Sequence, residues 1–82
     1  MRITYDEPKR LANLDKHGLD FASLDMEYFA GAITRPVERG RFQAIGRLAD
    51  GTVSVIFATL GSEAISIISM RRASAKERRL LK

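Results

Sequence analysis

The sequence has no cysteine, and this absence excludes several kinds of chemistry at once. Without thiols there are no disulfide cross-links, thiolate nucleophiles or zinc–thiolate sites, so stability has to come from core packing or a partner. Walker loops, dinucleotide-binding glycine motifs, His-Glu-x-x-His and close carboxylate pairs with ligand spacing are also missing, which argues against nucleotide- and metal-dependent catalysis. We therefore expect no cofactor and no metal, and any reaction has to be run by Arg, Lys and His.

Long apolar runs are missing as well. The first seven residues include Arg2, Asp6 and Glu7 and lack the apolar stretch of a secretory signal. The longest apolar stretch, residues 53–70, is interrupted by Gly61-Ser62-Glu63, which indicates two strands and a turn rather than a membrane span. We expect a soluble, cytoplasmic protein. With 82 residues, 45% of them apolar, it should form a single domain over residues 1–82 with one modest core.

Two helices are predicted in the N-terminal half. The first is predicted to begin after Asp6 as its N-cap residue and to end near Lys16, with Gly18 as the residue after its cap. Leu11 and Leu14 form a narrow apolar stripe on it. The second is predicted from Asp20 to Gly31, because its apolar residues recur at i, i+3, i+7 and i+8: Phe21, Leu24, Tyr28 and Phe29.

Strands dominate the rest of the chain. After a short candidate at residues 3–5, alternation predicts strands over 33–37, 41–48, 53–60 and 64–70, and Pro36 favours an edge position for the first of these four. Asp50-Gly51 indicates a type I′ hairpin and Gly61-Ser62 a second tight turn. The expected fold is α+β in two layers, with two N-terminal helices on an antiparallel sheet of about four strands and a C-terminal basic helix.

Positive charge is concentrated at the C-terminal end. Residues 71–82 hold six basic residues against one acidic residue, a net charge of +5, whereas residues 1–70 hold eight against nine. Ser74 and Glu77 have the spacing of a capping box and predict a helix start. Because the positive end of a helix dipole repels Arg71 and Arg72, an anion is expected among them, most simply a phosphate. A solvated basic tail is the alternative.

Individual basic residues each allow a structural and a functional interpretation. His17, the only histidine, either caps the first helix as a C-terminal cation or transfers protons, since a free imidazole titrates at about pH 6.5. Arg41 and Arg47 share a strand face and either cover a sheet edge or meet a ligand. Arg71 and Arg72 should point to opposite sides, so only one can line a given pocket. Arg78 lies on a solvated face or reaches back to the same anion.

Arg, Lys and His side chains suit the transfer of an RNA 2′-hydroxyl onto its neighbouring phosphate. In this reaction a base accepts the hydroxyl proton and guanidinium groups stabilise the charge that develops on phosphorus.

Over nearly its whole length the sequence resembles the BrnT toxins, ribonucleases of a bacterial type II toxin–antitoxin system. The resemblance is carried by three groups of residues: Tyr5, Asp6, Lys9, Asn13, Lys16, His17, Gly18 and Phe21; Arg41, Phe42, Ile45 and Gly46; and Ile68, Ser69, Arg71, Ala73, Glu77 and Arg78. The sequence differs from the family pattern at Tyr5, where tryptophan is usual, and at Met70, where a small residue is usual. Because methionine is larger, Met70 is expected to narrow the pocket.

The resemblance implies a RelE-like fold, metal-independent endoribonuclease activity that inhibits translation, and neutralisation by a small BrnA-like antitoxin with a ribbon-helix-helix domain. It also implies that operator DNA is contacted through the antitoxin. Carried over by position, the candidate catalytic residues are Lys16, His17, Arg41, Arg71 and Arg78. We assign proton transfer to His17, RNA backbone binding to Lys16 and Arg41, and stabilisation of the transition-state phosphate to Arg71 and Arg78.

Two other functions remain open at the level of sequence. One is a non-catalytic nucleic-acid-binding module, against which the basic segment offers no helix-turn-helix layout. The other is a degenerate toxin that only binds its antitoxin and acts as a co-repressor.

Overall fold

A computed structural model of the chain describes residues 1–49 and 51–81. In chain order the elements are β1 (Arg2–Tyr5), α1 (Glu7–His17), the 3₁₀ helix η1 (Phe21–Ser23), α2 (Met26–Gly31), β2 (Ile33–Glu38), β3 (Arg41–Leu48), β4 (Gly51–Leu60), β5 (Ala64–Arg72) and α3 (Ala75–Arg79).

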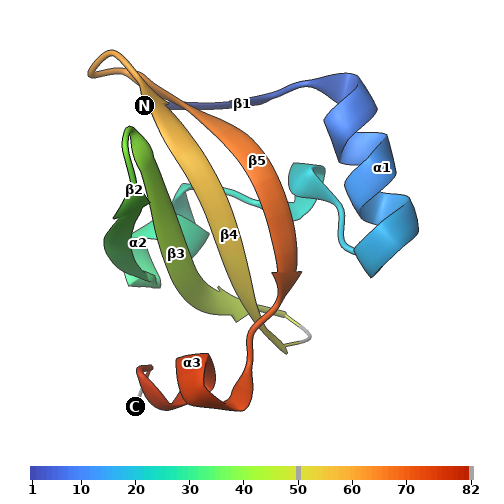
Figure 1. Cartoon of the computed structure of the whole chain (residues 1–82), viewed down its shortest axis with the longest axis vertical. Helices are drawn as coiled ribbons and strands as arrows, with labels where there is room; N and C mark the ends of the chain where they lie inside the picture. The colour runs from blue at the N-terminus through green and yellow to red at the C-terminus, as the bar shows by residue number, and fades with distance from the viewer. Residues whose placement is uncertain (50, 82) are drawn as a thin grey trace.

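The strands form one five-stranded sheet in the order β1-β5-β4-β3-β2 (Figure 1). The α+β class is confirmed, but the sheet has five strands rather than about four, and it is mixed because β1 pairs parallel to β5. The remaining pairs are antiparallel. Pro36 lies in β2, which is an edge strand as predicted, because proline offers no N–H to a second neighbour.

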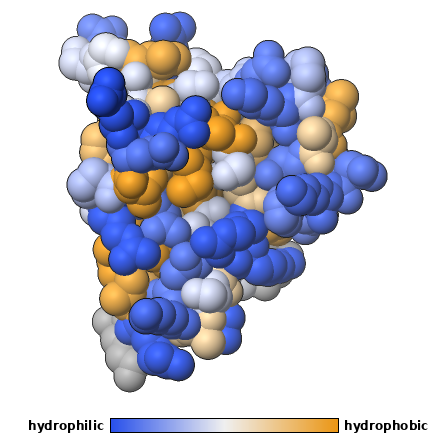
Figure 2. Space-filling view, viewed as in Figure 1, coloured by the Kyte–Doolittle hydropathy of each residue, from blue (hydrophilic) through white to orange (hydrophobic). Residues whose placement is uncertain are grey.

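The two faces of the sheet differ in what covers them. α2 lies behind the sheet in Figure 1 and η1 lies between β5 and α1, and together they bury a core against the sheet that includes Phe21, Tyr28, Val55 and Ile67. Within the described residues, the opposite face, turned toward the reader, is covered at one end, where α3 and the residues around it pack on β3. Figure 2 shows hydrophilic side chains spread across this open face beside a smaller apolar area.

Helix α1 begins and ends where the sequence predicts, but its buried side is not the predicted one. Asp6 accepts a hydrogen bond from the Lys9 N–H, and Gly18 closes the helix in the left-handed conformation with φ of 70°. Leu11 and Leu14, the predicted apolar stripe, are exposed, and the buried residue of the helix is Asn13. The helix therefore packs through a polar face.

The predicted second helix is divided into two. Asp20 caps the short η1, and Asp25 caps α2 by accepting from the Tyr28 N–H. A single helix over 20–31 is wrong because the Asp25 carboxylate starts a new helix in the middle of the apolar pattern. Phe21, Leu24 and Tyr28 are nevertheless buried, as the spacing predicts.

The hairpins follow the predicted order. β3 and β4 pair from Leu48 opposite Gly51, although the predicted type I′ turn falls on Asp50, which lies outside the described residues. The second turn contains Gly61 at φ of 63°, a conformation that favours glycine. Among the described residues, no helix has the length and apolarity needed to cross a membrane.

Candidate active site

A shallow cavity of about 250 Å³ lies between α1 and the open edge of β5. β1 pairs with β5 only as far as Ile67, so the rest of that edge is flanked by α1 (Figure 1). The cavity is lined by Lys9, Ala12, Asn13, Lys16, His17, Ile68 and Ser69. The structure thus brings the candidate residues Lys16 and His17 together with a further cation, Lys9.

Asn13 fixes this side of the cavity. Its Oδ1 accepts a hydrogen bond of 3.0 Å from the Met70 N–H, an edge donor of β5 that β1 does not reach, and its Nδ2 donates to the Leu19 carbonyl at 3.0 Å. One buried amide therefore satisfies a strand edge and the loop that follows α1. Since His17 is four residues after Asn13, one helical turn separates the anchor from the imidazole.

A β-bulge decides which way Arg71 points. Ile67 pairs with Phe57 and Ser69 with Ile56, so Ile68 is an extra residue and the alternation of β5 shifts there. Met70 consequently faces the core, where it is fully buried, while Ser69 and Arg71 face the open side of the sheet. The expectation that Met70 narrows the pocket is wrong, because its side chain lies among core residues.

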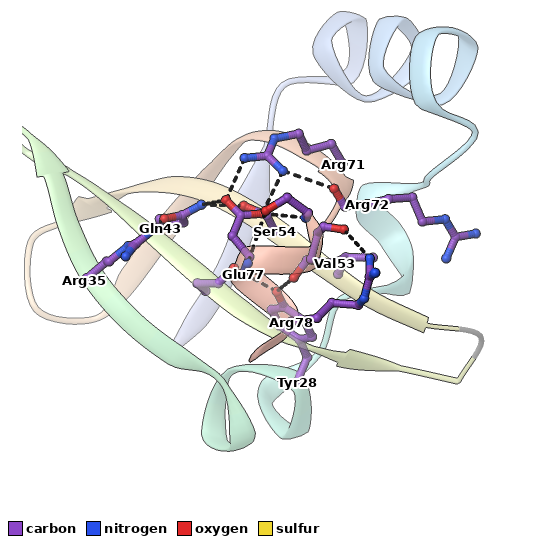
Figure 3. Close-up of polar contacts among 12 residues, drawn as sticks. Tyr28, Arg35, Gln43, Val53, Ser54, Arg71, Arg72, Glu77 and Arg78 are labelled. Carbon is purple, nitrogen blue, oxygen red and sulfur yellow. Dashed lines mark hydrogen bonds and ion pairs between the residues drawn. The ribbon is translucent and has the colours of Figure 1, made fainter. Parts of the chain in front are cut away.

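The anion expected beside Arg71 is supplied by the chain itself. Arg71 Nη1 and Nη2 donate to Glu77 Oε1 and Oε2, both at 2.9 Å (Figure 3). Glu77 also completes the predicted capping box, accepting from the Ser74 N–H at 2.9 Å. The expectation that charge balance here requires an external phosphate is therefore corrected. Arg72 extends away from Glu77, so the neighbouring arginines do point apart, as predicted.

Glu77 lies at the centre of a hydrogen-bonded network. Gln43, buried on β3, donates from Nε2 to Glu77 Oε2 at 2.9 Å and to Ser54 Oγ at 2.8 Å, and its Oε1 accepts from Arg35 Nε at 2.8 Å. The hydrogen bonds from Arg71 lower the pKa of the Glu77 carboxyl from 4.5 to about 2; burial opposes this shift, and Ser74 and Gln43 support it. Glu77 is accordingly a carboxylate at every physiological pH.

Arg78 and Arg41 do not join this cluster directly. Arg78 Nη1 donates to the Ala73 carbonyl at 3.0 Å, which ties α3 to the chain leaving β5. Arg41 is the first residue of β3, and its Nη1 lies 3.7 Å from Glu38 Oε1. Its partner Ala58 is four residues along β4 from Ser54, the partner of Arg71. Arg41 and Arg71 lie on strands that are two positions apart in the sheet, so their Cα atoms are about 16 Å apart.

Sequence reasoning missed three contributors: Lys9, Asn13 and the pairing of Glu77 with Arg71. A signal for the first two was present, because Lys9, Asn13, Lys16 and His17 follow the spacing i, i+4, i+7, i+8 and so share one helix face. The Glu77–Arg71 pair carries no such signal. In the described part of the chain, no three His, Asp or Glu side chains gather as potential metal ligands.

Comparison with known proteins gives a family and a structural relative. Residues 5–77 match the family described as "Ribonuclease toxin, BrnT, of type II toxin-antitoxin system". The crystal structure of the Brucella abortus ribonuclease toxin BrnT superposes with a TM-score of 0.86 at 51% sequence identity, covering 90% of this chain and 97% of that one. Comparison with curated protein sequences gives no significant match.

Proposed function

The chain belongs to the BrnT family of type II toxin–antitoxin ribonuclease toxins, and from this premise we propose that it is a metal-independent endoribonuclease that inhibits translation by cutting RNA. The observation that carries the proposal is the cavity beside β5, which gathers Lys9, Lys16 and His17 next to Ser69, two residues before Arg71. Neither of the two cavity lysines, Lys9 and Lys16, has an ion-pair partner among the described residues. This leaves their charge available to a polyanion.

The proposed reaction is an internal transesterification. His17 accepts the proton of a ribose 2′-hydroxyl, the 2′ oxygen bonds to the adjacent phosphorus, and the bond from phosphorus to the 5′ oxygen breaks. The 5′ oxygen takes a proton from solvent and leaves as a hydroxyl group. His17 then releases the proton that it accepted to solvent. The products are a 2′,3′-cyclic phosphate and a 5′-hydroxyl end. Lys16 binds the backbone, and Arg71 stabilises the charge that develops on the phosphate oxygens.

The remaining two candidates have supporting roles in this proposal. Arg41, about 16 Å from Arg71 on the same sheet face, contacts another phosphate of the bound strand rather than the reacting one. Arg78 holds the Ala73 carbonyl and so fixes α3, instead of touching the reacting phosphate as expected from the sequence.

The partner proposed for this toxin is a BrnA-like antitoxin with a ribbon-helix-helix domain, which neutralises it and contacts operator DNA in the complex. The support is the family match, together with exposed apolar residues such as Leu11 and Leu14 that the isolated chain does not bury.

The test is cleavage of a single-stranded RNA by the purified protein in excess EDTA. We expect cyclic-phosphate ends, and His17→Ala and Arg71→Ala should each slow cleavage by about 10²–10³-fold. Arg39→Ala removes the same charge from the exposed β2–β3 turn, away from the cavity, and is the matched control. Cleavage that persists in His17→Ala and Arg71→Ala, or that needs a divalent metal, contradicts the proposed site.

A second candidate function is that of a non-catalytic toxin that only binds its antitoxin and acts in repression. The observation that favours it is that Arg71 and Arg41 are already paired with Glu77 and Glu38 of the same chain. It predicts no RNA cleavage under any condition and no growth arrest when the protein is produced alone.

A further inference from the structure

Glu77 holds the Arg71 guanidinium by its outer edge, the one formed by Nη1 and Nη2. Its two outer N–H groups face the Glu77 carboxylate, and the second hydrogen of Nη1 faces the Arg72 carbonyl at 3.1 Å. A guanidinium has five N–H donors, so Nε–H and the second Nη2 hydrogen remain. These two lie parallel on the same edge and form a fork that matches two oxygens of a phosphate. In the described part of the chain, no group accepts a hydrogen bond from that edge.

Glu77 is much better enclosed than the arginine it holds. The Glu77 side chain is 12% exposed and that of Arg71 is 45% exposed. Besides Arg71, the carboxylate accepts from Gln43 Nε2 and the Ser74 N–H. Gln43 is in turn held by Ser54 Oγ and Arg35 Nε. Contacts from β2, β3, β4 and the start of α3 thus fix the carboxylate, and the carboxylate fixes the guanidinium.

We propose that Glu77 is a positioning residue of the ribonuclease reaction, which locks the outer edge of Arg71 so that its Nε/Nη2 edge is presented to the RNA phosphate. The inference rests on the proposed function and adds a residue to it. Glu77 itself does not touch RNA. Its pairing costs Arg71 no reactivity, because the fork that meets the phosphate is the one that Glu77 leaves open.

The test also detects the opposite role, in which Glu77 competes with RNA for Arg71. If RNA phosphate used the outer edge of Arg71, Glu77 would compete with the substrate, and its removal would strengthen binding. A positioning residue behaves differently, since misplacing a charged contact slows the chemical step more than it weakens ground-state binding.

The experiment is a double-mutant cycle of Glu77→Gln and Arg71→Ala, with kcat and KM measured on single-stranded RNA in EDTA. A fully 2′-O-methylated RNA of the same sequence, which has no attacking hydroxyl, reports binding. We expect Glu77→Gln to lower kcat by about 10–100-fold with KM and binding nearly unchanged. In the Arg71→Ala background the same change should have little further effect, because Glu77 acts through Arg71.

Several results would overturn the inference. These are an unchanged kcat in Glu77→Gln, tighter binding of the methylated RNA, and full additivity of the two substitutions, which indicates a structural role alone. Should Glu77→Gln not fold, Glu77→Asp takes its place in the cycle, since it keeps the charge but shortens the reach to Arg71. A wild-type protein that cuts no RNA refutes the proposed function and the inference together. Cleavage that depends on His17 but not on Glu77 refutes the inference alone.

Discussion

Replacing Asn13 by alanine removes the amide that joins α1 to β5. The substitution leaves the Met70 N–H and the Leu19 carbonyl without their partner. A buried polar group left unsatisfied costs about 1–3 kcal/mol, so the two together should lower the free energy of unfolding by about 2–6 kcal/mol. The free energy of unfolding of a chain of 82 residues is about 4–12 kcal/mol in total. The predicted loss is thus a large fraction of the stability.

The isosteric change Asn13→Asp separates the two hydrogen bonds. The new carboxyl still accepts from the Met70 N–H, but it donates to the Leu19 carbonyl only when protonated. Burial and that carbonyl raise its pKa in the folded state above the unfolded value of about 3.9, and the Met70 N–H opposes this rise. Its stabilising contribution is therefore complete at low pH and is lost as the pH rises through the folded pKa. The deficit relative to wild type should be larger at pH 7 than at pH 4.

The assay is urea unfolding followed by circular dichroism, at several values between pH 4 and pH 7. Asp15→Asn changes an exposed residue of the same helix and should stay within about 0.5 kcal/mol of wild type. If Asn13→Ala is as stable as this control, or if the Asn13→Asp deficit does not vary with pH, the polar anchor does not hold α1 to the sheet.

Three further predictions concern stability. Folding lowers the pKa of Glu77 from 4.5 to about 2, so the stability that its carboxylate contributes should be lost as the pH falls from 4.5 to about 2. In urea unfolding, the difference in stability between wild type and Glu77→Gln should shrink over the same range. Tyr28→Phe removes the hydroxyl next to the Ala44 and Val53 carbonyls and should cost about 1–2 kcal/mol; a neutral result would exclude a stabilising role for the hydroxyl. A Cβ at Gly46 would lie 2.9 Å from the Tyr28 ring, so Gly46→Ala should cost about 1–3 kcal/mol by thermal unfolding, more than Gly31→Ala, where nothing lies within 4 Å.

Much of the fold follows from local signals in the sequence. Asp6, Gly18 and the Ser74–Glu77 box mark helix ends by chemistry that acts over a few residues, and each lies where predicted. Pro36 marks an edge strand because it lacks a donor. The prediction of a single second helix is wrong for a related reason. The Asp25 side chain caps a new helix locally, whereas the longer apolar pattern reflects burial in the core and not a continuous helix.

The candidate site was less accessible from sequence. Lys16 and His17 share a cavity because α1 lies along the edge of β5, and Glu77 meets Arg71 because α3 returns to the sheet. Leu11 and Leu14 led to the wrong buried face, since apolar periodicity does not anticipate a helix that packs through asparagine. These contacts join segments far apart in the chain, and propensities do not encode them.

The sequence by itself determined the ends of α1, the start of α3, the absence of thiol chemistry, and the positive charge of residues 71–82. Only the tertiary structure decided which way that charge points. Strict alternation from Ile67 would turn Arg71 toward the core, whereas the extra residue Ile68 in the pairing with β4 turns it to the open face. The reason is that side chains alternate with a period of two, so one unpaired residue reverses the facing of all that follow.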